Sequence, residues 1–160
     1  MWQEIWNTVV AEFSDMSDVT QITRITLRLL VAAILGGLLG YEREVQGKSA
    51  GVRTHMMVAI GAALFVLIPQ QAGASTADLT RVLQGLIAGV GFLGVGTIIM
   101  GTREVETRGL TTAAGIWVTA AIGVAAGMGR ESTAVLSTFL ALFILSVIPW
   151  LYRTKMAKKE

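Results

Sequence analysis

The chain has 160 residues, of which 53% are hydrophobic and 15% charged, and its net charge is +2. It contains no cysteine, which excludes a disulfide framework, a thiolate metal site and a cysteine nucleophile. The charged residues are clustered, and this distribution excludes an ordinary soluble domain. Five stretches have no Asp, Glu, Lys or Arg: 29–41, 56–77, 82–102, 109–129 and 132–152.

These charge-free stretches are long enough for membrane spans. Four of them reach the roughly 20 residues that a helix needs to cross the hydrocarbon layer, and the first does so once 22–28 is added. A soluble helical bundle would need a polar face on each stretch, and the sequence shows none. We therefore predict an all-α integral membrane protein.

The first segment, 1–20, is predicted to be an amphipathic helix that lies on the membrane surface. Its large apolar residues recur at spacings of three and four: Trp2, Ile5, Trp6, Val9, Val10 and Phe13. The same segment is acidic and lacks the basic start of a cleavable signal peptide. We assign 1–20 to this interfacial helix, 21–152 to a transmembrane domain and 153–160 to a basic cytoplasmic tail.

Five transmembrane helices are predicted, joined by short connections with Gly, Pro69 or charged residues. Their predicted ranges are 22–41, 52–68, 82–101, 110–127 and 133–152. Four Lys and Arg residues fall on one side of the membrane and nine on the other, all in short loops or tails. The positive-inside rule puts the side with nine in the cytoplasm, so the N-terminus is predicted outside and the C-terminus inside.

A weak internal repeat links the first and third helices and the loops that follow them. Residues 43–45 match 103–105, and 51–54 matches 109–112. Both halves start outside, so a duplication would give a parallel repeat with two equivalent cytoplasmic loops. A chance match is the alternative.

Glycine is concentrated inside the predicted helices, where small residues let helix backbones approach closely in lipid. The candidate packing glycines are Gly36, Gly40, Gly85, Gly89, Gly91, Gly94, Gly96, Gly115, Gly123 and Gly127. A second interpretation of the run 89–96 is a bent or unwound third helix that lines a cavity.

The two cytoplasmic loops carry the polar residues with the best prospects of a specific role. The candidate cluster is Glu42, Arg43, Arg53, Thr54, His55, Arg108, Thr111 and Thr112. Several of them fall at the starts of the second and fourth helices, where free N–H groups favour an anion or carboxylate. Glu42 is predicted to pair with Arg53 or Arg108, although ordinary solvated loops are the alternative. His55 is the only histidine and is either a pH sensor or a polar residue at a helix end.

The familiar catalytic motifs are absent from the sequence. There is no phosphate-binding Gly-x-x-x-x-Gly-Lys-Ser/Thr loop, no His-Glu-x-x-His and no Gly-x-Ser-x-Gly. The helix interiors between 82 and 152 carry no ionisable side chain, which disfavours active transport by this chain alone. We expect no enzyme activity, no cofactor and no nucleic-acid partner. The expected partners are the lipid bilayer, another membrane protein or a second copy of the chain, and an ion or anion.

The same loops resemble the MgtC/SapB family of bacterial inner-membrane proteins. The resemblance covers about residues 25–130. Its residues are Gly40, Glu42-Arg43, Ala50-Gly51-Val52-Arg53-Thr54, Arg81, Gly89-Val90-Gly91-Phe92-Leu93-Gly94, Gly96, Arg108-Gly109-Leu110-Thr111-Thr112-Ala113-Ala114, Trp117 and Gly123.

The resemblance implies a five-helix domain with an outside N-terminus. It also implies a role in growth at low magnesium, in acid tolerance or in survival inside macrophages, and some members resemble regulators of the F-type ATP synthase more than transporters. The sequence ends eight residues after Tyr152, so we expect a short form without the soluble C-terminal domain of the longer members. The leading hypothesis is a regulator of a membrane partner in magnesium or acid stress. The alternative is a small Mg²⁺ transporter or channel gated by the cytoplasmic cluster.

Overall fold

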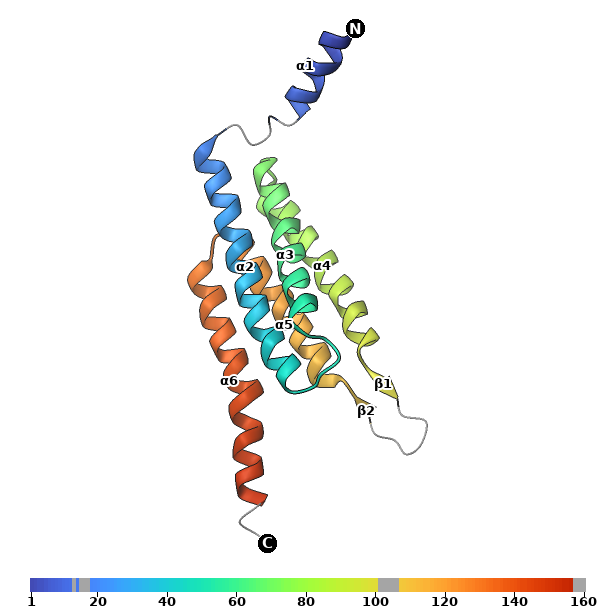
Figure 1. Ribbon diagram of the computed structural model, residues 1–160, viewed down its shortest axis with the longest axis vertical. Coiled ribbons are helices and arrows are strands. Elements are labelled where there is room, and N and C mark those ends of the chain that lie inside the picture. Colours follow the sequence, from blue (N-terminus) through green and yellow to red (C-terminus); the bar gives the residue numbers. More distant parts are fainter. Residues whose placement is uncertain (13, 15–17, 101–106, 157–160) are drawn as a thin grey trace.

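Five long helices form an antiparallel bundle in the computed structural model (Figure 1). The structure describes residues 1–12, 14, 18–100 and 107–156. At 99–100, 107–108 and 150–156 it describes the backbone alone. The helices are α2 (Val19–Val45), α3 (Val52–Gln71), α4 (Thr76–Gly96), α5 (Leu110–Gly127) and α6 (Glu131–Met156). All five are long and apolar enough to cross a membrane. The prediction of an all-α membrane protein is therefore confirmed.

The N-terminal segment forms a shorter helix than the predicted 1–20. Helix α1 (Trp2–Glu12) has no buried residue, and Figure 1 shows it beyond the end of the bundle at which α2 begins. Residues 19 and 20 already belong to α2, because the Asp18 side chain caps that helix by accepting a hydrogen bond from the Thr20 N–H at 3.0 Å.

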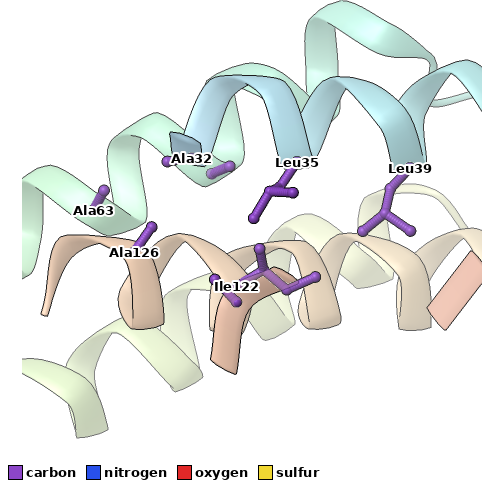
Figure 2. Close-up of a cluster of buried hydrophobic side chains, with 8 residues drawn as sticks. Ala32, Leu35, Leu39, Ala63, Ile122 and Ala126 are labelled. Atoms are coloured by element: carbon purple, nitrogen blue, oxygen red, sulfur yellow. The ribbon is translucent and has the colours of Figure 1, made fainter. Parts of the chain in front are cut away.

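Helix α5 is the centre of the bundle. Half of its membrane-spanning residues are buried, against 11% in each of α4 and α6. Its neighbours α2, α3 and α6 share a core with it, shown in Figure 2, that consists mainly of alanines and a few larger side chains. The members of this core are Ala32, Leu35, Leu39, Ala59, Ala63, Ile122, Ala126 and Ala134. Small side chains let these helices pack closely without a soluble protein's bulky core.

Three boundaries of α3 and α4 differ from the predicted ones for identifiable reasons. Helix α4 begins at Thr76 rather than at 82, because Ser75 and Asp78 form a reciprocal capping box. It ends at Gly96 rather than at 101, where the Thr97 N–H and hydroxyl both donate to the Gly94 carbonyl. Helix α3 continues past Pro69 to Gln71, since a proline in the last turn removes only one hydrogen bond.

The end of the predicted third helix is instead part of a short antiparallel strand pair. Strand β1 (Ile99–Met100) pairs with β2 (Thr107–Arg108), with Ile99 opposite Arg108. Gly109 then caps α5 with a φ of 97°, a conformation that favours glycine. The predicted bounds of α5, 110–127, agree with the structure.

Candidate functional site

Two glycines of α2 allow the start of α3 to lie directly against it. A Cβ at Gly36 would lie 2.7 Å from the His55 carbonyl oxygen, and one at Gly40 would lie 2.6 Å from the Val52 Cα. Both distances are shorter than real Cβ contacts, so any larger residue would push the helices apart. The contact fixes the first turn of α3 against α2.

Helix α5 packs against α3 by the same means. A Cβ at Gly123 would lie 2.2 Å from the Ala59 carbonyl oxygen, and one at Gly127 would lie 2.6 Å from that of Ala63. On α3, His55 precedes Ala59 and Ala63 at the same four-residue spacing, so the three lie on one face. The imidazole therefore occupies the first position of a row that is otherwise alanine.

His55 is completely buried at this position, with an exposed fraction of 0%. Its Nδ1 lies 3.0 Å from the Gly51 carbonyl oxygen, which can only accept, so Nδ1 carries the hydrogen and donates. In the neutral ring, Nε2 then has a lone pair, and it has no hydrogen-bond partner among the described residues. It faces α5, since a Cβ at Gly115 would lie 3.5 Å from it.

A buried ion pair lies at the same end of the bundle, in the last turn of α2. Arg43 is 3% exposed and Glu42 is 11% exposed, and the Nε and Nη2 of Arg43 both contact Oε2 of Glu42. The other oxygen of Glu42, Oε1, is buried and has no partner within the described part of the chain. Arg43 lies one turn after Gly40 on the α2 face that meets α3.

Thr112, in the first turn of α5, is also buried, with an exposed fraction of 2%, and lies three residues before Gly115, which faces His55. We call the four residues Glu42, Arg43, His55 and Thr112 the buried polar cluster. Three helices contribute to it, and it contains one carboxylate, one guanidinium, one imidazole and one hydroxyl. Because the carboxylate and the guanidinium are paired, the cluster has no net charge while the imidazole is neutral.

The remaining predicted members of the cytoplasmic cluster lie elsewhere. Arg53, Thr54 and Thr111 are exposed, and the side chain of Arg108 lies outside the described residues. The expected partners of Glu42 were Arg53 or Arg108, whereas the structure pairs it with Arg43. Arg53 is two positions from His55, and two positions on a helix differ by about 200°, so a buried His55 turns Arg53 outward.

The first turn of α3 does bind a carboxylate, but the carboxylate belongs to the chain itself. The Glu44 side chain accepts a hydrogen bond from the Val52 N–H at 3.0 Å. A negative group at this position is favoured by the helix dipole. The Glu44 carboxylate therefore accepts a hydrogen bond from one of the N–H groups that were predicted to bind an anion or carboxylate.

The glycines of α4 differ from those of α2 and α5. Gly94 makes ordinary contact with Ala113, at 3.5 Å for an added Cβ. A Cβ on any of the other four would meet no atom within 4 Å: Gly85, Gly89, Gly91 and Gly96. Helix α4 is continuous up to Gly96, so the segment 89–96 is not unwound, and Val90 and Gly94 are its buried residues among those described.

An arginine network at the opposite end of the bundle was not predicted from the sequence. Arg28 donates from Nη1 to the Gly127 carbonyl at 3.0 Å and to Oε1 of Gln70 at 3.4 Å, and its Nε lies 3.9 Å from Oε1 of Glu131. The network joins α2, α3, α5 and α6. The sequence predicted only that Arg28 lies toward the outer side of the membrane, because a single sequence does not show that α5 ends beside this residue.

The equivalent glycines of the proposed repeat occupy equivalent positions. Gly51 is the N-cap residue of α3, and Gly109 is that of α5. The other half of the match, residues 103–105, lies outside the described residues. The duplication stays a prediction.

Comparisons with known proteins identify one family and several bacterial relatives. The MgtC family model matches residues 29–154. Protein SrpB of Synechococcus elongatus is 41% identical over 133 residues, which cover 76% of this chain and 73% of SrpB. The putative magnesium transporter YhiD of Escherichia coli K12 is 39% identical over 128 residues, covering 76% of this chain and 59% of YhiD.

Protein MgtC of Brucella abortus is 42% identical over 116 residues, which cover 72% of this chain and 46% of that protein. The chain thus spans less than two thirds of the length of YhiD and of MgtC. No solved structure matches the chain.

Proposed function

The chain belongs to the MgtC family of membrane proteins, and we propose that it acts in magnesium or acid-stress homeostasis. It does so without enzymatic activity, by regulating a partner in the bacterial inner membrane. The site of this action is the buried polar cluster at the predicted cytoplasmic end. The helices α4 and α6 provide the surfaces for the partner.

The observation that carries this proposal is the pairing of Glu42 with Arg43. Mg²⁺ is bound in proteins by carboxylate oxygens and water, and the negative charge of the carboxylate supplies much of the attraction. A guanidinium that contacts the same carboxylate cancels that charge. The pair favours a structural or signalling role for the cluster over passage of a divalent cation.

The exposed faces of α4 and α6 support the second part of the proposal. Each has 89% of its span outside the core, and both display large apolar side chains. Among these are Phe92 on α4 and Phe139 on α6. Such faces contact lipid, and a partner helix that replaces the lipid gains van der Waals packing.

The proposal is tested by Mg²⁺ uptake in cells that lack their own copy of the protein. We expect the chain to restore growth at low magnesium or low pH while the initial rate of Mg²⁺ entry stays that of the deleted strain. An entry rate that rises in proportion to the amount of chain in the membrane would contradict it. The chain level is measured by immunoblot in each culture.

The second candidate function is a small Mg²⁺ transporter or channel gated by the same cluster. It is favoured by the two buried atoms without partners among the described residues, Oε1 of Glu42 and Nε2 of His55. A relative is also named a putative magnesium transporter. Proportional Mg²⁺ entry in the same experiment would favour this function.

A further inference from the structure

A polar cavity of about 380 Å³ lies between the beginning of α2 and the end of α3, at the predicted outer end of the bundle. This volume is within the range of small-molecule sites. The charged and amide side chains in its lining are Asp18, Gln21, Arg24, Arg28, Gln70 and Gln71. We call it the outer cavity.

The donors of the outer cavity come from two facing helices. Gln21, Arg24 and Arg28 follow one another at three- and four-residue spacing, so they form one ridge of α2. Gln70 and Gln71 are the last two residues of α3. Two guanidinium groups and three side-chain amides thus line one space.

One of the guanidinium groups is held in place by the fold. Arg28 bonds the Gly127 carbonyl and Gln70, and a Cβ at Gly129 would lie 2.3 Å from its Nη2, so the turn between α5 and α6 closes on it. Arg24, one turn earlier, is exposed. A fixed cation and an accessible one therefore lie side by side in the wall.

The outer cavity lies at the level of the lipid headgroups. Helix α5 has 18 residues, or about 27 Å, which only just spans the hydrocarbon layer. It ends at Gly127, the residue that Arg28 bonds, so Arg28 marks the boundary of that layer. Figure 1 shows α2 and α3 extending beyond the junction of α5 and α6, and the outer cavity lies on this extension.

Among the described residues, the charges that line the outer cavity sum to +1, from Arg24 and Arg28 against Asp18. Asp18 is partly committed, since it caps α2 through the Thr20 N–H. Glu131 lies 3.9 Å from Nε of Arg28 but does not line the cavity. The lining therefore suits a singly charged anion with neighbouring hydroxyl groups, which the glutamine amides can bind.

We propose that the outer cavity binds a phosphodiester group, as carried by the glycerol headgroup of phosphatidylglycerol. A phosphodiester carries one negative charge, and guanidinium groups bind its oxygens through charge-assisted hydrogen bonds. The site is at the opposite end from the buried polar cluster. It therefore does not depend on the proposed regulatory function.

The test is native mass spectrometry of the full chain in detergent, titrated with phosphatidylglycerol and, separately, with a glucosyl diacylglycerol of the same acyl chains. The wild-type chain is expected to prefer phosphatidylglycerol. Arg24→Gln should weaken its binding about tenfold, because one charge-assisted hydrogen bond is lost. Arg81→Gln, which removes an exposed arginine of α4 at the same end that pairs with Asp78, is the matched control and should change nothing.

A second variant tests the sign of the ligand's charge. Asp18→Asn keeps the cap of α2, since Asn is an equally good N-cap residue, and removes the negative charge that the described residues give the lining. It should bind phosphatidylglycerol more tightly than the wild type. Weaker binding by Asp18→Asn, or equal binding by Arg24→Gln and Arg81→Gln, would overturn the proposal.

Soluble glycerophosphoglycerol separates the two sources of the phosphodiester. If it displaces phosphatidylglycerol, the phosphodiester alone is recognised and a free ester is a ligand too. If it does not, the site requires the lipid. Both results support the proposal provided that Arg24→Gln weakens binding to phosphatidylglycerol.

Discussion

Glu42 and Arg43 are adjacent in the sequence, and their pairing inside the bundle makes each dependent on the other. Arg43 is 3% exposed, so its guanidinium has lost most of its water and relies on the carboxylate of Glu42. We predict that Glu42→Gln lowers the free energy of unfolding by about 3 to 5 kcal/mol, because it leaves a buried cation without its counter-charge. Reversible denaturation in mixed detergent micelles measures the change.

The matched control for this variant is Glu44→Gln, on the same turn of α2. Glu44 is exposed, and a glutamine amide oxygen can still accept the hydrogen bond from the Val52 N–H. Its effect should stay below about 1 kcal/mol. Equal losses in the two variants would show that the Glu42–Arg43 pair is not buried as described.

Removing both charges of the pair should cost less than removing one. In Glu42→Gln/Arg43→Met no uncompensated charge remains, and replacement of a whole buried pair is often neutral. The double variant is therefore expected to be more stable than Glu42→Gln alone. The same denaturation measurement gives the coupling between the two sites, and purely additive losses would contradict it.

At this scale the sequence predicted where the polar residues gather but not which of them pair with one another. Glu42, Arg43, His55 and Thr112 were all among the candidates because they lie near the predicted helix ends. Which of them turn inward depends on the angle at which α3 meets α2, and Gly36 and Gly40 set that contact. That contact joins residues far apart in the chain, so a single sequence does not show it.

Among the elements, α3 is held between α2 and α5 by glycines that touch its backbone. We predict that Gly123→Ala destabilises the bundle by about 1 to 3 kcal/mol, because the added methyl group would lie 2.2 Å from the Ala59 carbonyl oxygen. Thermal unfolding in detergent measures this loss. Gly89→Ala is the control, since its methyl group meets no atom within 4 Å and alanine favours the helix. A loss as large for Gly89→Ala would mean that α4 packs against a second chain or a partner.

The bounds of a helix could be predicted where charged residues and glycines lie directly at its two ends. Helix α5 agrees with its predicted bounds because Arg108-Gly109 precedes it and glycine and arginine follow it. The bounds of α4 differ from the predicted ones, because the Ser75–Asp78 capping box, and not the beginning of the charge-free stretch, determines where this helix starts. The strand pair after α4 depends on contacts between two separate segments, and no sequence pattern within either segment predicted it.

The predicted orientation of the whole molecule rests on the distribution of its charges, and the absence of cysteine from the sequence makes this orientation easy to test. Thr76→Cys places a thiol at the predicted outer end, and Lys48→Cys places one in the loop at the predicted cytoplasmic end; both positions are exposed. In intact spheroplasts a membrane-impermeant maleimide should label position 76 only. Permeabilised cells should show labelling at both positions, and the reverse pattern in spheroplasts would invert the topology.

We propose that the chain acts on a membrane partner and does not itself carry magnesium. Mg²⁺ entry into liposomes that contain the purified chain and a trapped magnesium-sensitive dye, with an imposed Mg²⁺ gradient and membrane potential, tests this directly. We expect entry no faster than in liposomes without protein, because Arg43 neutralises the buried carboxylate of Glu42. Saturable entry that scales with the amount of wild-type chain, and that is lost in a folded Glu42→Gln/Arg43→Met variant, would contradict it.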